Sequence, residues 1–236
     1  MKENSGANII AGAVIGGALI GAVRKQSSWS RTRARWIAFD ALHAVDTGAG
    51  AAEQVLEYPS GNNSYAPAPW KTLPYVIGLA SLPVQGFTFV DIGCGKGKVL
   101  LSALQYPFAR IAGVEYSPYL CQVAQKNVAA ARLLRRRCTN VEITCADAVE
   151  YPVPEGPVIF FFANPFTDDL MERMLQNILS SYWTSPRPMY LIFYAASSRL
   201  LRITDFLRRE RGDGARPRAS GLVGKRTVYV FELLWQ

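Results

Sequence analysis

Residues Phe87–Leu101, FTFVDIGCGKGKVLL, decide the fold of this 236-residue chain. An apolar, strand-favouring run stops at a cluster of glycines and is followed at once by apolar residues at helical spacing. A strand, a glycine turn and a helix in this order predict a loop that holds an anionic or polar ligand at the start of the helix. Gly93, Gly95 and Gly97 suit such a loop, because a side chain would block close approach of the backbone or oppose a positive φ. Asp91 at the end of the strand strengthens this interpretation.

Three later runs repeat the pattern of a short apolar strand that ends in polar residues. They are Arg110–Glu115, Val141–Cys145 followed by Asp147-Ala148, and Val158–Ala163 followed by Asn164-Pro165-Phe166. The carboxyl ends of strands in an open α/β sheet share the edge where such sheets bind ligands. Glu115 stands 24 positions after Asp91 (115 minus 91), and an acid at that place suits the hydroxyls of a ribose.

The four strands and the polar residues at their ends, in this order, resemble the class I S-adenosylmethionine-dependent methyltransferases. The resemblance extends from Phe87 to the C-terminus. The resemblance implies an α/β fold with a doubly wound, mostly parallel, seven-stranded Rossmann-like sheet, and S-adenosyl-L-methionine as cofactor. In that family the glycine loop passes under the methionine part of the cofactor, the acid after the second strand holds the ribose, and Asp-Ala after the third strand reads the adenine. The residue after the fourth strand faces the methyl acceptor. The resemblance therefore implies cofactor-binding roles for Asp91, Gly93, Cys94, Gly95, Gly97, Glu115, Tyr116, Asp147 and Ala148, and catalytic roles for Asn164 and Phe166.

Two other classes of protein remain to be weighed against a methyltransferase. A nicotinamide or flavin oxidoreductase would carry GxGxxG, but the sixth position counted from Gly93 is Lys98. A catalytically inactive scaffold that binds the cofactor is the second alternative, and the retained acids Asp91, Glu115 and Asp147 speak against it.

Asn164-Pro165-Phe166 gives an indication of the methyl acceptor. This motif resembles the (Asp/Asn)-Pro-Pro-(Tyr/Phe) signature of methyltransferases acting on amide or exocyclic amino nitrogens. In those enzymes the Asn side chain and a backbone carbonyl accept the N–H bonds of the acceptor, and the ring stacks on it. This chain lacks the second proline, which lowers the weight of a nucleic-acid base as acceptor. Asn164 as a simple turn residue before proline is the alternative.

The N-terminal residues Ile9–Val23 carry no charge and contain two GxxxG spacings, a pattern that suits helix pairing in a membrane. The run is shorter than the ~20 residues of a spanning helix. Basic residues follow it, which predicts a membrane-associated protein with its catalytic domain on the cytoplasmic side. A buried or loose helix in a cytoplasmic protein is the alternative, and a signal peptide is disfavoured by Arg24-Lys25 at the place of the cleavage site.

The order of segments along the chain resembles that of the membrane-anchored lysine methyltransferases of the ATP-synthase c-subunit type. This resemblance implies a protein lysine as the methyl acceptor. N-methylation of nucleic acid or of a small molecule is the alternative. We divide the chain into a hydrophobic segment 1–28, a helical extension 29–85 with a Pro- and aromatic-rich stretch, and a methyltransferase domain 86–236. That stretch, Tyr58–Trp70, is either a surface connector or a lid in which Tyr58, Tyr65 or Trp70 closes over the ligands.

Periodicity predicts the remaining elements. Helices are expected at Ser30–Val45, Thr72–Leu82, Ser117–Arg137, Thr167–Tyr182 and Ser197–Arg209, strands at Met189–Ala195 and Thr227–Leu233, and a polar loop at Arg211–Gly224. The arginines at the end of the helix Ser117–Arg137 are interpreted as complementing its dipole, with nucleic-acid contact as the alternative.

Composition adds limits on chemistry. The net charge of +8 favours acidic partners such as nucleic acid, anionic lipid or an acidic protein face, unless the arginines are simply solvated. The four cysteines form no zinc pattern and suit a reducing compartment, so we expect no metal. The single histidine, His43, excludes Ser-His-Asp and His-rich metal chemistry.

Overall fold

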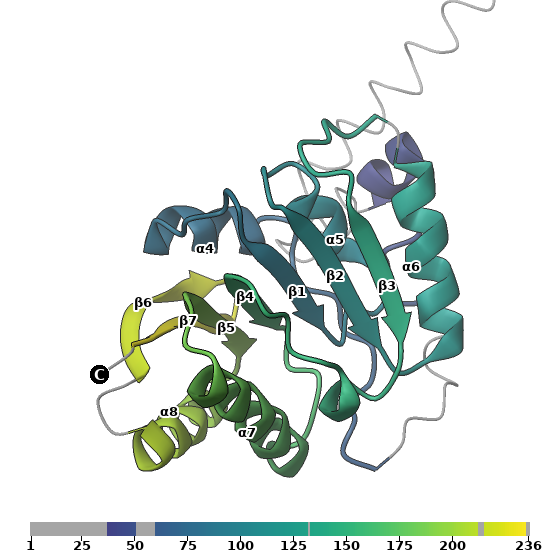
Figure 1. Cartoon of the computed structure of the whole chain (residues 1–236). Coiled ribbons are helices and arrows are strands. Elements are labelled where there is room, and N and C mark those ends of the chain that lie inside the picture. The colour runs from purple at the N-terminus through teal and green to yellow at the C-terminus, as the bar shows by residue number, and fades with distance from the viewer. Residues whose placement is uncertain (1–36, 51–59, 132, 212–214, 235–236) are drawn as a thin grey trace, which may run out of the picture. The chain divides into compact units, whose positions relative to one another are not determined.

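The computed structural model describes residues 37–50, 60–131, 133–211 and 215–234 (Figure 1). The chain divides into two units, 1–42 and 43–236. Residues 37–43 are helical. The hydrophobic run Ile9–Val23 lies outside the described residues, and among those described no helix is long and apolar enough to cross a bilayer.

The second unit is built on a seven-stranded sheet in the order β3-β2-β1-β4-β5-β7-β6. The strands are β1 Thr88–Ile92, β2 Arg110–Glu115, β3 Val141–Cys145, β4 Val158–Phe162, β5 Met189–Ala195, β6 Ala215–Val223 and β7 Arg226–Leu233. β1 to β5 run parallel, whereas β7 pairs antiparallel with both β5 and β6. The expected mostly parallel, seven-stranded sheet is confirmed.

Helices cover both faces of the sheet. They are α4 Thr72–Ala80, α5 Lys98–Ala103, α6 Pro118–Ala130, α7 Asp168–Thr184 and α8 Ser197–Arg211, with a short 3₁₀ helix η1 at Ala148–Glu150. α4, α5 and α6 pack on one face, and α7 and α8 pack on the other (Figure 1). A hydrophobic core lies between the sheet and α7 and α8, where Phe162 of β4 and Phe193 of β5 stack with ring centroids 5.0 Å apart.

The direction of winding reverses between β1 and β4. From β1 the chain proceeds to β2 and β3 on one side, then returns to pair β4 with the other side of β1. A crevice opens where neighbouring strands lead to opposite sides in this way, and open α/β sheets bind ligands there. The fold therefore places the ends of β1 and β4, with Asp91 and Asn164, on the two sides of one crevice.

Two elements differ from expectation. Ser117 caps α6 as predicted, accepting a hydrogen bond from Leu120 N, but the helix ends at Ala130 and not at Arg137. The arginines Arg135–Arg137 therefore lie beyond the helix, but Arg136 still donates from Nη2 to the carbonyl of Val128 in the last turn of α6, as expected of a basic residue that complements the helix dipole. The predicted loop Arg211–Gly224 contains the edge strand β6, whose polar and Pro-containing sequence carries no strand pattern because only one of its sides is paired.

Candidate active site

A cleft lies at the carboxyl ends of β1, β2 and β4. Its volume is about 770 Å³, counting the part open to solvent. Its lining comes from three groups of residues. They are Asn62–Ala68; the region after β1 and β2 with Asp91, Gly93, Cys94, Gly95, Lys98, Val99, Val114, Glu115, Tyr116 and Leu120; and Ala148 with Ala163–Phe166.

The glycine loop after β1 passes directly beneath two neighbouring segments. Gly93 and Gly95 have φ angles of +72° and +54°. A Cβ atom on Gly93 would lie 2.5 Å from Cβ of Pro165, and one on Gly95 would lie 2.3 Å from the ring of Tyr65. Both reasons for glycine that the sequence suggested, positive φ and close approach, are therefore present.

Asp91 forms a buried carboxyl group in the floor of the cleft. Its side chain is 1% exposed, and Oδ1 has no hydrogen-bond partner among the described residues. Burial, with the nearby charge of Glu115 adding to it, raises the pKa of Asp91 to about 8. A cationic ligand group bound beside Asp91 would favour its charged form and supply the missing partner.

Glu115 ends β2 and binds the glycine loop. Its Oε2 accepts a hydrogen bond from Gly95 N at 2.9 Å, and its Oε1 accepts one from Ser117 N at 2.9 Å. Burial raises the pKa of Glu115, and the backbone N–H donors oppose this rise. Each carboxylate oxygen keeps a further lone pair, so the side chain can still accept from the hydroxyls of a ribose.

The other expected cofactor residues are placed in different ways. Tyr116 and Ala148 line the cleft, and so does Cys94, whose thiol pKa is raised by burial and by Asp91 and Glu115. Asp147 is not among the lining residues, and its Oδ1 instead accepts from Val149 N to cap η1. Gly97 also stands outside the lining, where a Cβ atom would be 3.2 Å from Cβ of Ala124 on α6.

The segment after β4 turns sharply at Asn164, which has a φ of +59°. Asparagine tolerates this left-handed conformation better than other side chains. Its Oδ1 accepts a hydrogen bond from Nη1 of Arg199 on α8 at 2.8 Å. Phe166 lines the cleft but is 4% exposed and packs in the core beneath it.

The main-chain carbonyls of this turn are bound by Asn63. Its Nδ2 donates to Asn164 O at 2.9 Å and to Phe166 O at 2.8 Å, and its backbone N donates to Pro165 O at 2.9 Å. The Asn side-chain oxygen and the carbonyls that would receive the N–H bonds of an amine in the resembled signature thus already accept hydrogen bonds within this chain.

The Pro- and aromatic-rich stretch contributes Asn62–Ala68 to the lining of the cleft. Tyr65 packs on Gly95 and donates to Thr47 O at 3.0 Å. Trp70 does not line the cleft, and its ring centroid is 5.5 Å from Nζ of Lys98. Tyr58 lies outside the described residues.

Sequence reasoning missed Asn63, Lys98 and Arg199 as residues at or behind the cleft. Lys98 is 3% exposed and follows the last glycine of the loop, so its position next to the motif could have indicated it. Asn63 and Arg199 reach the turn at Asn164 from 101 and 35 residues away in sequence. No local pattern identifies such distant contacts.

Comparisons with known proteins agree with this fold. Residues 89–182 match a family model described as a methyltransferase domain. A ribosomal protein L11 methyltransferase of Alteromonas mediterranea is 29% identical over 107 residues, which cover 45% of this chain and 33% of the relative. The match thus spans about a third of that relative's length.

Solved structures share the fold. A ribosomal protein L11 methylase from Lactobacillus delbrueckii subsp. bulgaricus superposes with a TM-score of 0.52 at 12% identity, over 71% of this chain and 81% of the other. An RNA methyltransferase from Salinibacter ruber, solved in complex with S-adenosyl-L-homocysteine, gives a TM-score of 0.51 at 20% identity, over 72% and 95%.

The matched model identifies residues 89–182 as a methyltransferase domain, and the sheet has the fold of solved methyltransferases, one of them in complex with S-adenosyl-L-homocysteine. The further resemblance to the membrane-anchored type that acts on the ATP-synthase c-subunit stays a prediction.

Proposed function

We propose that this chain transfers a methyl group from S-adenosylmethionine to a protein. The observation that carries the proposal is the convergence of Asp91, Glu115 and the glycine loop on one cleft at the point where the sheet reverses its winding. Asp91 would hold the ammonium group of the cofactor, and Glu115 its ribose hydroxyls. The cofactor supplies a methyl group on a positively charged sulfur, so the protein has only to bind it and align the acceptor.

Binding of the cofactor is the first test. Titration calorimetry of S-adenosylmethionine into the full chain should give micromolar affinity. Glu115→Gln should weaken it by ~1–3 kcal/mol, because an amide cannot accept from Gly95 N, Ser117 N and the ribose together. Glu142→Gln is the matched control, since Glu142 lies on the neighbouring β3, is exposed, and pairs with Arg110. Absence of cofactor binding by the folded chain would contradict the proposed function.

For the acceptor we propose a lysine side chain of a protein. The relative acts, by its name, on ribosomal protein L11, and the sequence plan resembles lysine methyltransferases. Labelled methyl groups should pass from the cofactor into protein in a cell extract freed of small molecules, and acid hydrolysis should release methyllysine. Label that nuclease removes would support the alternative, a nucleic-acid acceptor, instead.

Association with a membrane through Ile9–Val23, with the catalytic domain on the cytoplasmic side, is also proposed from the sequence. The full chain should sediment with lipid vesicles, and a chain lacking residues 1–28 should stay in the supernatant. Equal sedimentation of both would reject this proposal.

A further inference from the structure

Arg199 is a buried cation directly behind the turn that follows β4. The residue is 9% exposed, and its Nε is 3.2 Å from Oδ1 of Asp168 at the start of α7. Nη1 donates to Asn164 Oδ1 at 2.8 Å, while Nε and Nη2 have no hydrogen-bond partner among the described residues. A buried guanidinium is costly unless it is paired, so its contacts with Asp168 and Asn164 fix its position.

The contact with Arg199 determines which end of the Asn164 carboxamide meets the cleft. A guanidinium has donors and no acceptor, so only the oxygen of the carboxamide can face it. The amide nitrogen, Nδ2, therefore points to the other side, and within the described part of the chain nothing accepts a hydrogen bond from it. Asn164 itself lines the cleft.

The main-chain carbonyls of the turn do not alter the orientation of the Asn164 carboxamide. Those of Asn164, Pro165 and Phe166 each accept a hydrogen bond from Asn63. The side chain of Asn164 thus meets a ligand as a donor, although each of these carbonyls keeps one further lone pair.

We propose that Arg199 is a positioning residue that holds Asn164 with Nδ2 toward the cleft, and that Asn164 binds a hydrogen-bond-accepting oxygen of the methyl acceptor. The inference rests on the proposed methyl transfer and states which substrate chemistry meets this site. A neutral amine has one lone pair, which it needs for attack on the methyl carbon, so it cannot also accept from Asn164. An oxygen keeps a second lone pair for that hydrogen bond.

The oxygen can belong to either of two parts of a substrate. In the first case a carboxylate or phenolate is methylated, and its oxygen is the nucleophile. The oxygen then forms the bond to the methyl carbon, and the sulfur keeps the electron pair of the broken bond. In the second case the nucleophile is a lysine amine, which also loses a proton, and the oxygen belongs to a carbonyl group beside that amine. The hydrogen bond to Asn164 Nδ2 is the same in both cases.

Side-chain amide spectra of the ¹⁵N-labelled full chain test the donor directly, without knowledge of the acceptor. The Asn164 pair is identified as the one missing in Asn164→Asp. In the presence of S-adenosylhomocysteine, acetate should shift this pair saturably, and n-butylamine should not. Arg199→Met should weaken the acetate response about tenfold, because the carboxamide is then free to turn. Arg199→Lys, which still donates, should restore most of it.

Arg202→Met is the matched control, since Arg202 lies on the same helix and pairs with the same Asp168 but is 60% exposed. It should leave the acetate response unchanged. A shift caused by n-butylamine, no shift with acetate, or an equal response in Arg199→Met would each overturn the proposal. Spectra recorded without S-adenosylhomocysteine separate the two proposals, because an acetate shift in a chain that binds no cofactor would reject methyl transfer but keep Asn164 as a donor.

Activity gives an independent measurement. Asn164→Asp still accepts from Arg199, then as an ion pair, but replaces the donor with an acceptor, so labelled methyl transfer into protein should fall at saturating cofactor. Unchanged or faster transfer would overturn the inference and favour an amine held by an oxygen. In the wild-type product, base-labile label identifies a methylated carboxylate, O-methyltyrosine identifies a phenolate, and methyllysine identifies a neighbouring carbonyl.

Discussion

At the scale of single residues, Asp91 opposes folding in the free protein. Its pKa is about 8 in the folded chain, against an ordinary value of 3.8. The folded state therefore binds the proton more tightly than the unfolded state, and Asp91 lowers stability as the pH rises between these two values. Such a loss of stability is typical of a side chain with a role in ligand binding, because a bound cationic ligand offsets the loss.

This gives a prediction for the pH dependence of cofactor binding. Below about pH 8 Asp91 is protonated in the free protein, and binding of the cofactor ammonium must release that proton. The affinity for S-adenosylmethionine should therefore rise by up to about tenfold per pH unit from about pH 6 to about pH 8 and then level off. Calorimetry in buffers of different ionisation enthalpy measures both the affinity and the proton.

Asp91→Asn serves as the control. It should bind more weakly, with no proton release over this range, and its free form should be more stable than the wild type near pH 8. The same pH slope in Asp91→Asn would assign the dependence to another group.

At the scale of elements, residues 61–63 and the turn after β4 form one hydrogen-bonded unit. Asn62 and Phe166 form an antiparallel bridge, and Thr167 N donates to Gly61 O at 2.7 Å. Asn63 adds three hydrogen bonds to the carbonyls of the turn. The two sides of the cleft are therefore tied to each other at this end.

Asn63→Ala should loosen this unit. It removes both hydrogen bonds of Nδ2 and leaves part-buried carbonyls without them, at a cost of ~1–3 kcal/mol in the free energy of unfolding. Urea unfolding measures that cost, and amide exchange at Thr167 should become faster. Asn177→Ala removes one exposed side-chain bond to Val149 O and should have a smaller effect. Equal effects of the two variants would contradict a special role of Asn63.

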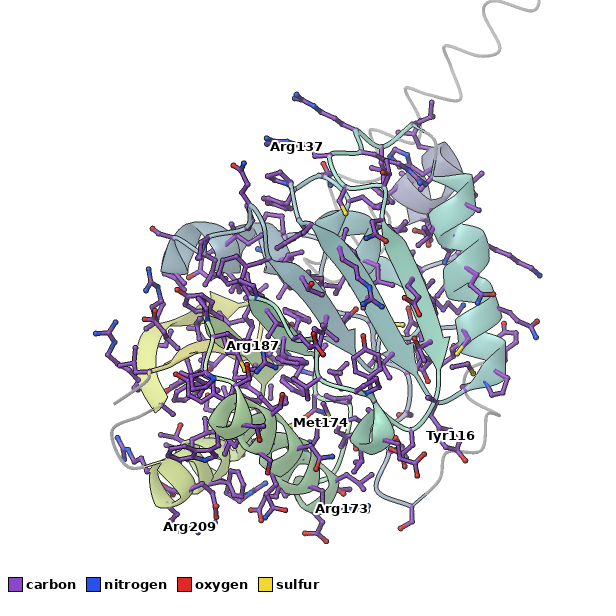
Figure 2. All side chains as sticks on the ribbon, viewed as in Figure 1. Tyr116, Arg137, Arg173, Met174, Arg187 and Arg209 are labelled. Carbon is purple, nitrogen blue, oxygen red and sulfur yellow. The ribbon has the colours of Figure 1, made fainter. Side chains whose placement is uncertain are left out.

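At the scale of the whole molecule, the positive charge is not gathered at the cleft. Arg137 lies at the edge of the sheet where the parallel strands begin, and Tyr116 lies at the edge where they end (Figure 2). Strands β1 and β2 have five and six residues, so the edges are ~17–20 Å apart. This exceeds the screening length of about 8 Å at physiological salt.

Neutralising the exposed residues Arg135 and Arg137 with Arg135→Gln and Arg137→Gln should therefore leave cofactor affinity within about twofold of the wild type. If these arginines contact nucleic acid, the same double variant should weaken binding of a labelled duplex and reduce the salt dependence. Titration of both ligands in one buffer separates the two effects. A large loss of cofactor affinity would show that this edge is coupled to the cleft.

The sequence by itself determined the parallel sheet and the acids at its edge. Strands such as β5 are buried on both faces and read as continuous apolar runs, and the positive φ angles of Gly93, Gly95 and Gly97 favour glycine in the loop. These features depend on neighbours in sequence, so a local pattern records them. The end of α6 and the edge strand β6 left no such pattern, because contacts elsewhere in the fold decide them.

Only the tertiary structure decided how the acceptor side of the cleft is built. The motif Asn164-Pro165-Phe166 suggested an oxygen that accepts from an amine, but Arg199 and Asn63 bind the atoms that would do so. Both partners come from distant elements, and the polarity of a carboxamide depends on which partner meets it. The sequence could name Asn164 but not the direction in which its amide points, because that direction is set by contacts formed when the chain folds.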